Sequence, residues 1–240
     1  MLTHPYNSLW SVFALLLALA ITHATFQLGV SVLTLLSGHS LGRKRSLRRL
    51  FMLNLAYVTG SFVMTMLLLG ALLTVAFTYM YEIEPHAWMI FVVVSCIIAA
   101  GIMTRYYRRG KGTVLWLPRS AANYLADRAK RTKNVFEAGI LGGAAVLAEL
   151  PFTIVPLMCT AYLMMVFIAP INHLVVMSTY SLIVVSPLIL ITVLIAGGHR
   201  LSTIQRWREE NKSFLQYAAA TLLLAIALYV AIFYISGGSV

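Results

Sequence analysis

An acidic residue stands near the middle of a long apolar stretch of the chain, close to two prolines. The stretch runs from about Phe136 to Ile168 and contains Glu149, Pro151 and Pro156. Proline lacks a backbone N–H and clashes with the preceding turn, so we predict a broken or kinked helix with open carbonyls here. Burial favours the protonated form of a carboxyl group, which can then exchange protons at neutral pH. Glu149 is a candidate coupling or substrate site; the competing interpretation is a structural acid bonded to freed backbone or a hydroxyl.

Two further polar residues lie in the first apolar stretch. His23 and Gln27 are one helical turn apart and should share a helix face. Together with Glu149 and Thr153 they could form a polar pocket in the middle of a membrane. The alternative is ordinary hydrogen bonding between helices, worth about 1 kcal/mol for each pair. We favour hydrogen bonding for Gln27 and leave both interpretations open for His23.

Small and polar residues also gather in two other apolar stretches. Gly60 and Ser61 lie in one. Tyr180, Ser186 and Pro187 lie in the other, and Pro187 is a third position where a helix could break. These residues could line the same cavity or allow close helix packing, and we favour packing. Gly139 and Gly143 have the spacing of a small-residue contact face between helices.

Other patterns that could carry chemistry are missing from the sequence. The six histidines and two cysteines are scattered and show no metal-ligand spacing. Gly110-Lys111-Gly112-Thr113 is too short for a phosphate-binding loop. Asp127 is the only aspartate, and no Ser-His-Asp set is credible. We therefore predict a protein that is not an enzyme and that has no catalytic residues, no metal site and no cofactor.

The composition indicates which elements position these residues. The chain has 240 residues, of which 60% are hydrophobic and 10% charged, whereas soluble domains have about 45–50% and about 25%. A transmembrane helix needs about 20 apolar residues, and only helices or closed barrels satisfy the backbone in lipid. The alternating pattern of a barrel is absent, so we predict an all-α protein with six transmembrane helices. Their approximate ranges are 9–36, 50–77, 87–103, 136–168, 174–196 and 214–235.

The basic residues predict an orientation. A net charge of +11 would suggest nucleic acid in a soluble protein. All 18 lysines and arginines, however, lie in the connections 43–49, 105–133 and 200–212, which are on one side if all six segments cross. The positive-inside rule makes that side cytoplasmic. We expect a multi-pass protein of the plasma (inner) membrane with both termini outside and no nucleic-acid partner.

The two halves of the chain look related at an offset of about 126 residues. Ala20–Phe26 then aligns with Val146–Phe152. Three spans in each half would give the halves opposite orientations, a plan common in transporters whose site lies near the midplane. The alternative is that any six-span protein divides this way. The predicted units are a first repeat, 1–104, a basic loop, 105–135, and a second repeat, 136–240.

The basic loop is predicted to contain a short helix capped by Ser120. Ala121, Tyr124 and Leu125 would face lipid while basic side chains meet anionic headgroups. Those basic residues are Arg128, Lys130 and Arg131. There are two alternative roles for these basic residues. They could serve only to set the membrane topology, or they could form a docking surface for a cytoplasmic protein.

Several pieces of the chain resemble the broad LysE/CcdA-like superfamily of six-span membrane proteins. They are the basic connection Gly42–Arg45, the region Pro151–Pro156, the region around Pro187, and the last segment after Arg206-Trp207-Arg208. The resemblance implies an amino-acid exporter, a metal-ion exporter or a thiol-electron carrier.

One departure from that superfamily narrows the implied function. The electron carriers place a cysteine beside a proline in spans one and four, where this chain has Thr25-Phe26 and Pro151-Phe152. That difference argues against disulfide-based electron transfer and leaves the exporter branch.

These observations predict a membrane transporter that exports a small polar or cationic solute, with proton coupling through Glu149. Its partners would be the lipid bilayer and the solute, with a homo-oligomer left open. One alternative is a non-transporting membrane partner that assembles another complex, and a second is a lipid-handling protein that uses the basic face. A water-accessible cavity reaching Glu149 would favour transport, whereas Glu149 buried in protein contacts would favour the partner protein.

Overall fold

The structure, a computed structural model, describes residues 9–26, 28–41, 47–80, 84–105, 119–197 and 201–235, and within these ranges every element is a helix. The longer helices are α1 (Leu9–Ala24), α2 (Leu28–Leu41), α3 (Leu47–Val75), α4 (Glu84–Arg105), α6 (Val135–Phe167), α7 (His173–Ala196) and α9 (Lys212–Val230). The shorter helices are α5 (Arg119–Arg131) and α8 (Leu201–Glu210), and the single turns are η1 (Ala76–Met80), η2 (Pro170–Asn172) and η3 (Ala231–Ile235). The all-α prediction is confirmed, whereas α8 was not predicted.

Several of these helices are suited to a membrane. Four stretches, in α3, α6, α7 and α9, are long and apolar enough to cross a bilayer. The pair α1 and α2 adds a fifth when it is taken as one span bent by 45° at the break between the two helices. The apolar part of α4, Trp88–Thr104, is shorter. The chain is thus a membrane-embedded helical protein with four or five candidate spans in its described part.

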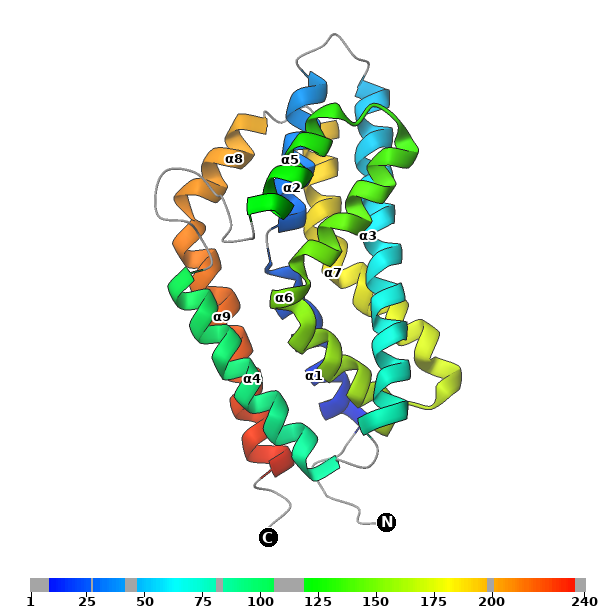
Figure 1. Cartoon of the computed structure of the whole chain (residues 1–240), viewed down its shortest axis with the longest axis vertical. Helices are drawn as coiled ribbons and strands as arrows, with labels where there is room; N and C mark the ends of the chain where they lie inside the picture. The colour runs from blue at the N-terminus through cyan, green and yellow to red at the C-terminus, as the bar shows by residue number, and fades with distance from the viewer. Residues whose placement is uncertain are drawn as a thin grey trace.

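The helices form one bundle with a looser pair along its side. Helix α3 packs against α6 and α7, and α1 packs against the same two helices. Helices α4 and α9 lie side by side and contact mainly each other (Figure 1). Helix α1 begins and α9 ends at the same end of the bundle, and α5 and α8 lie toward the opposite end (Figure 1).

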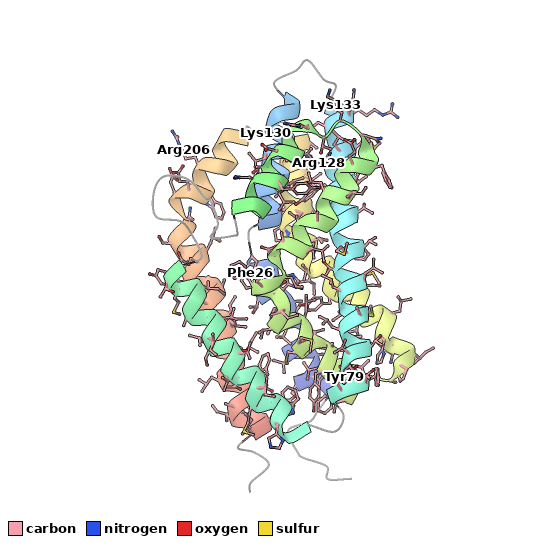
Figure 2. The ribbon with its side chains drawn as sticks, viewed as in Figure 1. Phe26, Tyr79, Arg128, Lys130, Lys133 and Arg206 are labelled. Atoms are coloured by element: carbon pink, nitrogen blue, oxygen red, sulfur yellow. The ribbon has the colours of Figure 1, made fainter. Side chains whose placement is uncertain are left out.

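Basic side chains gather at the end that carries α5 and α8. Arg128, Lys130, Lys133 and Arg206 lie there, whereas Tyr79 lies at the opposite end (Figure 2). We refer to the end of the bundle that carries α5 and α8 as the basic end. Phe26 lies between the two ends (Figure 2).

Helix α5 differs from its prediction in two respects. It begins at Arg119, so Ser120 lies inside its first turn and is not the residue before it. Leu125 is 2% exposed and packs inside the protein together with Ala129, since α5 lies against α2. The prediction that Leu125 faces lipid is therefore wrong, because this apolar face of α5 is covered by another helix.

The two ends of α6 are held by side chains. Asn134 accepts a hydrogen bond from the Phe136 N–H at 3.1 Å, and Glu137 accepts one from the Lys133 N–H at 3.3 Å. Such contacts satisfy N–H groups that have no partner within the helix. At the other end, His173 Nε2 lies 2.9 Å from the Ile168 carbonyl oxygen, so this nitrogen carries the proton that the bond requires.

The prolines do not break their helices, so the first form of the prediction, a broken helix, is wrong; α6 instead bends along its length, as the second form, a kinked helix, expects (Figure 1). Helix α6 runs without interruption through Pro151 and Pro156, and α7 runs through Pro187. Pro187 leaves the Ile183 carbonyl without its helical donor, and the Ser186 hydroxyl donates to that carbonyl at 2.7 Å. Side-chain hydroxyls and neighbouring helices commonly make proline tolerable within membrane helices.

Helices α3 and α6 cross at very short distance. A methyl group at Gly60 would overlap the Gly139 carbonyl, and one at Gly142 would overlap the Tyr57 carbonyl. Ser61 Oγ also donates to the Gly142 carbonyl at 3.2 Å. The predicted contact face on α6 is therefore confirmed, and it includes Gly142 as well as the two glycines that sequence spacing indicated.

Candidate functional site

The helix break nearest the middle of the bundle lies between α1 and α2, and α6 is continuous. Helix α1 ends at Ala24, and short-range donors take its last carbonyls. The Phe26 N–H donates to the His23 carbonyl at 3.1 Å, and Thr25 Oγ1 donates to the Thr22 carbonyl at 2.6 Å. Such bonds satisfy carbonyls that a helix end leaves open. Helix α2 then continues in a direction 45° away. The break leaves His23 in the last turn of α1.

A small cavity of about 30 Å³ lies beside this break. Its polar lining residues are His23, Ser61, Thr65 and Glu149. Helices α1, α2, α3, α6 and α7 all contribute to its wall. A cavity needs about 10–15 Å³ to hold one water molecule, so this one has room for about two.

Glu149 is the acidic group of this cavity. Its side chain is 8% exposed, and it lies within electrostatic range of the Tyr57 hydroxyl. That hydroxyl donates to the Gly29 carbonyl at 2.9 Å, in the first turn of α2. Ser61 Oγ and Thr65 Oγ1 both donate to backbone carbonyls of α3, at 3.1 and 2.9 Å.

His23 makes a buried hydrogen bond with Tyr180 of α7. His23 Nδ1 lies 3.0 Å from the Tyr180 hydroxyl, and the two rings meet edge to face with their centroids 5.8 Å apart. Tyr180 also lines a second cavity of about 170 Å³ between α1 and α7, whose walls are mainly apolar. The His23–Tyr180 pair therefore stands between the polar cavity and the apolar one.

Tyr180 belongs to one of the small-polar stretches, but it was not predicted as the partner of His23. A general rule could have indicated Tyr180 as a candidate. A tyrosine hydroxyl inside an apolar segment needs a hydrogen-bond partner, and His23 was a polar residue to which no partner had been assigned. Phe26 and Phe152 make a further contact that was not predicted, with stacked rings 6.3 Å apart.

The structure brings together only part of the predicted pocket. His23 and Glu149 both line the cavity. Thr153 is buried but does not line it, and its hydroxyl lies 3.4 Å from the Glu149 backbone carbonyl. Gln27 lies outside the described residues. The small-polar stretches were expected either to line a cavity or to allow close packing, and each interpretation holds at some positions. Ser61 and Pro187 line the cavity, whereas Gly60 packs against α6.

The predicted interface residues lie away from this cavity. Arg128, Lys130 and Arg131 are exposed at the basic end. The guanidinium of Arg128 lies 5.8 Å from the centre of the Tyr124 ring, and the hydrogen bond to Tyr124 raises the pKa of Arg128 above its ordinary value. Trp207 of α8 is also exposed.

Among the described residues, no three His, Cys, Asp or Glu side chains lie where they could hold a metal ion. No protein-family model, curated protein or solved structure matches this chain. The function is therefore argued from the site.

Proposed function

We propose that the protein is a membrane transporter that exports a small polar or cationic solute and carries a proton on Glu149. The observation behind this proposal is a buried carboxyl group that opens on a polar cavity beside a helix break. Ionisable groups within membrane bundles are costly and commonly mark ion or proton pathways. Discontinuous helices near the midplane recur at transporter binding sites. The resemblance to exporters of the LysE/CcdA-like superfamily points the same way.

Residue pairs at the 126-residue offset support the inverted repeat that this proposal includes. His23 and Glu149 are equivalent at this offset, and both line the cavity. The equivalent residues Phe26 and Phe152 stack on each other. In an inverted repeat, equivalent residues near the pseudo-two-fold axis approach one another, so contacts of this kind are expected around a shared central site.

The pairing of helices supports the same arrangement. In a 3+3 plan, α1 with α2 forms span one, α3 span two, α4 span three, α6 span four, α7 span five and α9 span six. Each helix then contacts its equivalent: α1 packs against α6, α3 against α7, and α4 against α9. This arrangement needs α4 to cross the membrane, and its apolar part, Trp88–Thr104, is near the lower limit of about 17 residues.

The size of the cavity indicates which species it admits. Pockets for organic ligands have volumes of about 300–1,000 Å³, well above the 30 Å³ found here. This conformation therefore suits a proton, a small ion or water, and binding of a larger solute would require the helices around the break to separate.

A second candidate function is a non-transporting membrane partner of another complex. The small cavity and the 8% exposure of Glu149 favour this alternative, because a structural acid would also be enclosed by protein.

Transport is tested with purified protein in vesicles that contain a pH-sensitive dye. We expect a gradient of at least one solute from a panel of basic amino acids, diamines and divalent cations to change the internal pH. Vesicles without protein are the control. If no solute of the panel changes the internal pH, export coupled to protons is wrong for these classes of solute.

The proposed orientation places the basic end in the cytoplasm, and cysteine labelling tests it. The two native cysteines are first removed by Cys96→Ser and Cys159→Ser. Two variants of this background then carry one thiol each, Tyr79→Cys or Glu209→Cys, at exposed positions toward opposite ends of the bundle. We expect a membrane-impermeant thiol reagent to label Tyr79→Cys in intact cells and Glu209→Cys only after permeabilisation. The reverse pattern would contradict the orientation.

A further inference from the structure

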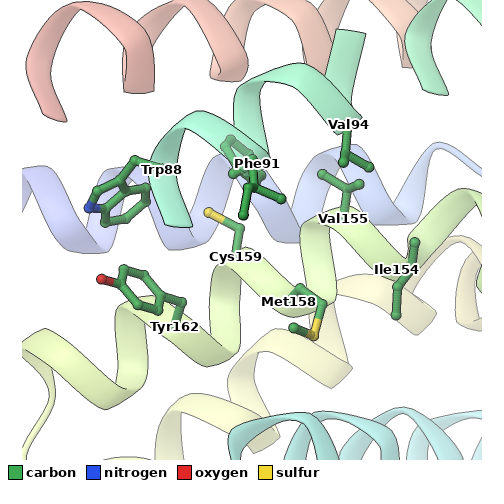
Figure 3. Close-up of a pocket in the computed structure, with 9 residues that line it drawn as sticks. Trp88, Phe91, Val94, Ile154, Val155, Met158, Cys159 and Tyr162 are labelled. Atoms are coloured by element: carbon green, nitrogen blue, oxygen red, sulfur yellow. The ribbon is translucent and has the colours of Figure 1, made fainter. Parts of the chain in front are cut away.

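A cavity of about 170 Å³ opens between α4 and α6 and is lined almost entirely by apolar side chains. Phe91 and Val94 of α4 face Val155 and Cys159 of α6 across it (Figure 3). Trp88 and Tyr162 lie at one end, and Val94 and Ile154 lie toward the other (Figure 3). We call this cavity the α4–α6 groove.

The groove exists because α4 is attached to α9. Gln216 Nε2, near the start of α9, donates to the Ile102 and Met103 carbonyls at the end of α4, at 2.6 and 2.9 Å. Helices α4 and α9 also pack along each other over their length, whereas α4 contacts α6 much less. The α4–α9 pair therefore stands off from the main bundle, and the space left beside α6 forms the groove.

An aromatic cluster marks one end of the groove. Trp88 meets Tyr162 edge to face at 4.8 Å between ring centroids, and it meets Tyr234 at 4.5 Å. Helix α4 begins here, at the end of the bundle away from the basic end (Figures 1 and 2). Tryptophan and tyrosine concentrate where hydrocarbon gives way to lipid headgroups. From Trp88 to Val94 the groove then follows α4 inward for about 9 Å, by the helical rise per residue.

We propose that the α4–α6 groove binds one acyl chain of a membrane phospholipid, whose glycerol end lies at the aromatic cluster. A polar solute would lose its hydration in this groove without gaining hydrogen bonds. A partner helix is about 10–12 Å across, and it cannot enter between α4 and α6 because these two helices still contact each other. A hydrocarbon chain is narrow and flexible, it is the surrounding solvent at this depth, and it matches both the apolar lining and the aromatic end.

The experiment uses the intrinsic fluorescence of Trp88 in the full chain, with Trp10, Trp116 and Trp207 changed to phenylalanine. The protein is placed in phosphatidylcholine vesicles that contain a rising fraction of lipid with brominated acyl chains, which quench tryptophan on contact. Trp88 is 7% exposed, so chains that merely surround the bundle reach it poorly. We expect strong quenching of Trp88, because a chain in the groove would contact its ring.

Two neighbouring valines provide a matched comparison. Val94→Phe fills the groove, whereas Val93→Phe adds the same volume at a position that is 57% exposed and does not line the groove. We expect Val94→Phe to remove most of the quenching of Trp88 and Val93→Phe to leave it unchanged. Equal quenching in both variants, or no quenching in the parent, would overturn the proposal.

A second measurement needs no change to the tryptophans. Unaltered protein should retain phospholipid through purification in detergent, and Val94→Phe should retain less, as counted by extraction and mass spectrometry. If the unaltered protein retains none, the proposal is wrong, whether or not the variants fold. A second copy of the chain on this face would instead appear as a dimer that Val94→Phe disrupts while the unaltered protein carries no lipid, and that result would also overturn it.

Discussion

Glu149→Gln is expected to reduce solute-driven pH changes to the level of vesicles without protein, while the variant accumulates and purifies like the parent. Glutamine has nearly the same shape and keeps hydrogen-bonding capacity, but it cannot take up or release a proton. The loss would therefore report on the proton and not on packing. The measurement is the internal pH of vesicles, made with whichever solute the parent transports.

Glu210→Gln is the matched control for this change. Glu210 is an exposed acid of α8, so its replacement should leave transport unchanged. Unchanged flux in Glu149→Gln would refute the coupling role of that carboxyl. If Glu149→Gln instead fails to accumulate, Glu149 is a structural acid, and the non-transporting alternative is favoured.

Gly142→Ala is expected to destabilise the bundle severely, and Gly60→Ala should do the same. The new methyl group would collide with a backbone carbonyl of the facing helix at either position, and a backbone cannot swing aside as a flexible side chain can. Overpacking typically costs about 1–3 kcal/mol, and we expect values at or above about 3 kcal/mol here. Thermal unfolding in detergent, followed by the loss of the monodisperse peak, measures the effect.

Gly101→Ala provides the comparison, because no atom lies within 4 Å of a methyl group placed there. It lies in the exposed part of α4, so its replacement should not lower the unfolding temperature. Equal stability of Gly101→Ala and Gly142→Ala would show that α3 and α6 do not cross as closely as described.

The sequence predicted the helices well because lipid leaves few alternatives for an apolar backbone. Glu149 and His23 could be found for a related reason, since a polar residue stands out within an apolar run. The helix break was predicted at the wrong place. Proline is a strong local signal, yet neighbouring helices and a hydroxyl such as that of Ser186 kept α7 continuous.

The actual break had almost no local signal. It falls at Thr25-Phe26, where neither glycine nor proline occurs, and it depends on hydrogen bonds that form only once α1 has ended. The partner of His23 could not be predicted either, because Tyr180 is 157 positions away along the chain. The α4–α6 groove could not be predicted either. It forms because α4 packs more closely on α9 than on α6, and this packing is decided only when the helices assemble.

The helices on the two sides of the break, α1 and α2, form hydrogen bonds with two different neighbouring helices. Helix α1 is tied to α7 through His23 and Tyr180 at 3.0 Å. Helix α2 is tied to α3 by the Tyr57 hydroxyl on the Gly29 carbonyl, and by Ser37 Oγ on Asn54 Oδ1 at 3.0 Å. Thr25 and Phe26 thus join two helices whose hydrogen bonds go to different neighbours, α7 for α1 and α3 for α2. In the proposed transporter, the angle at this break sets how His23 of α1 lies relative to Gly29 of α2, and both residues line the polar cavity.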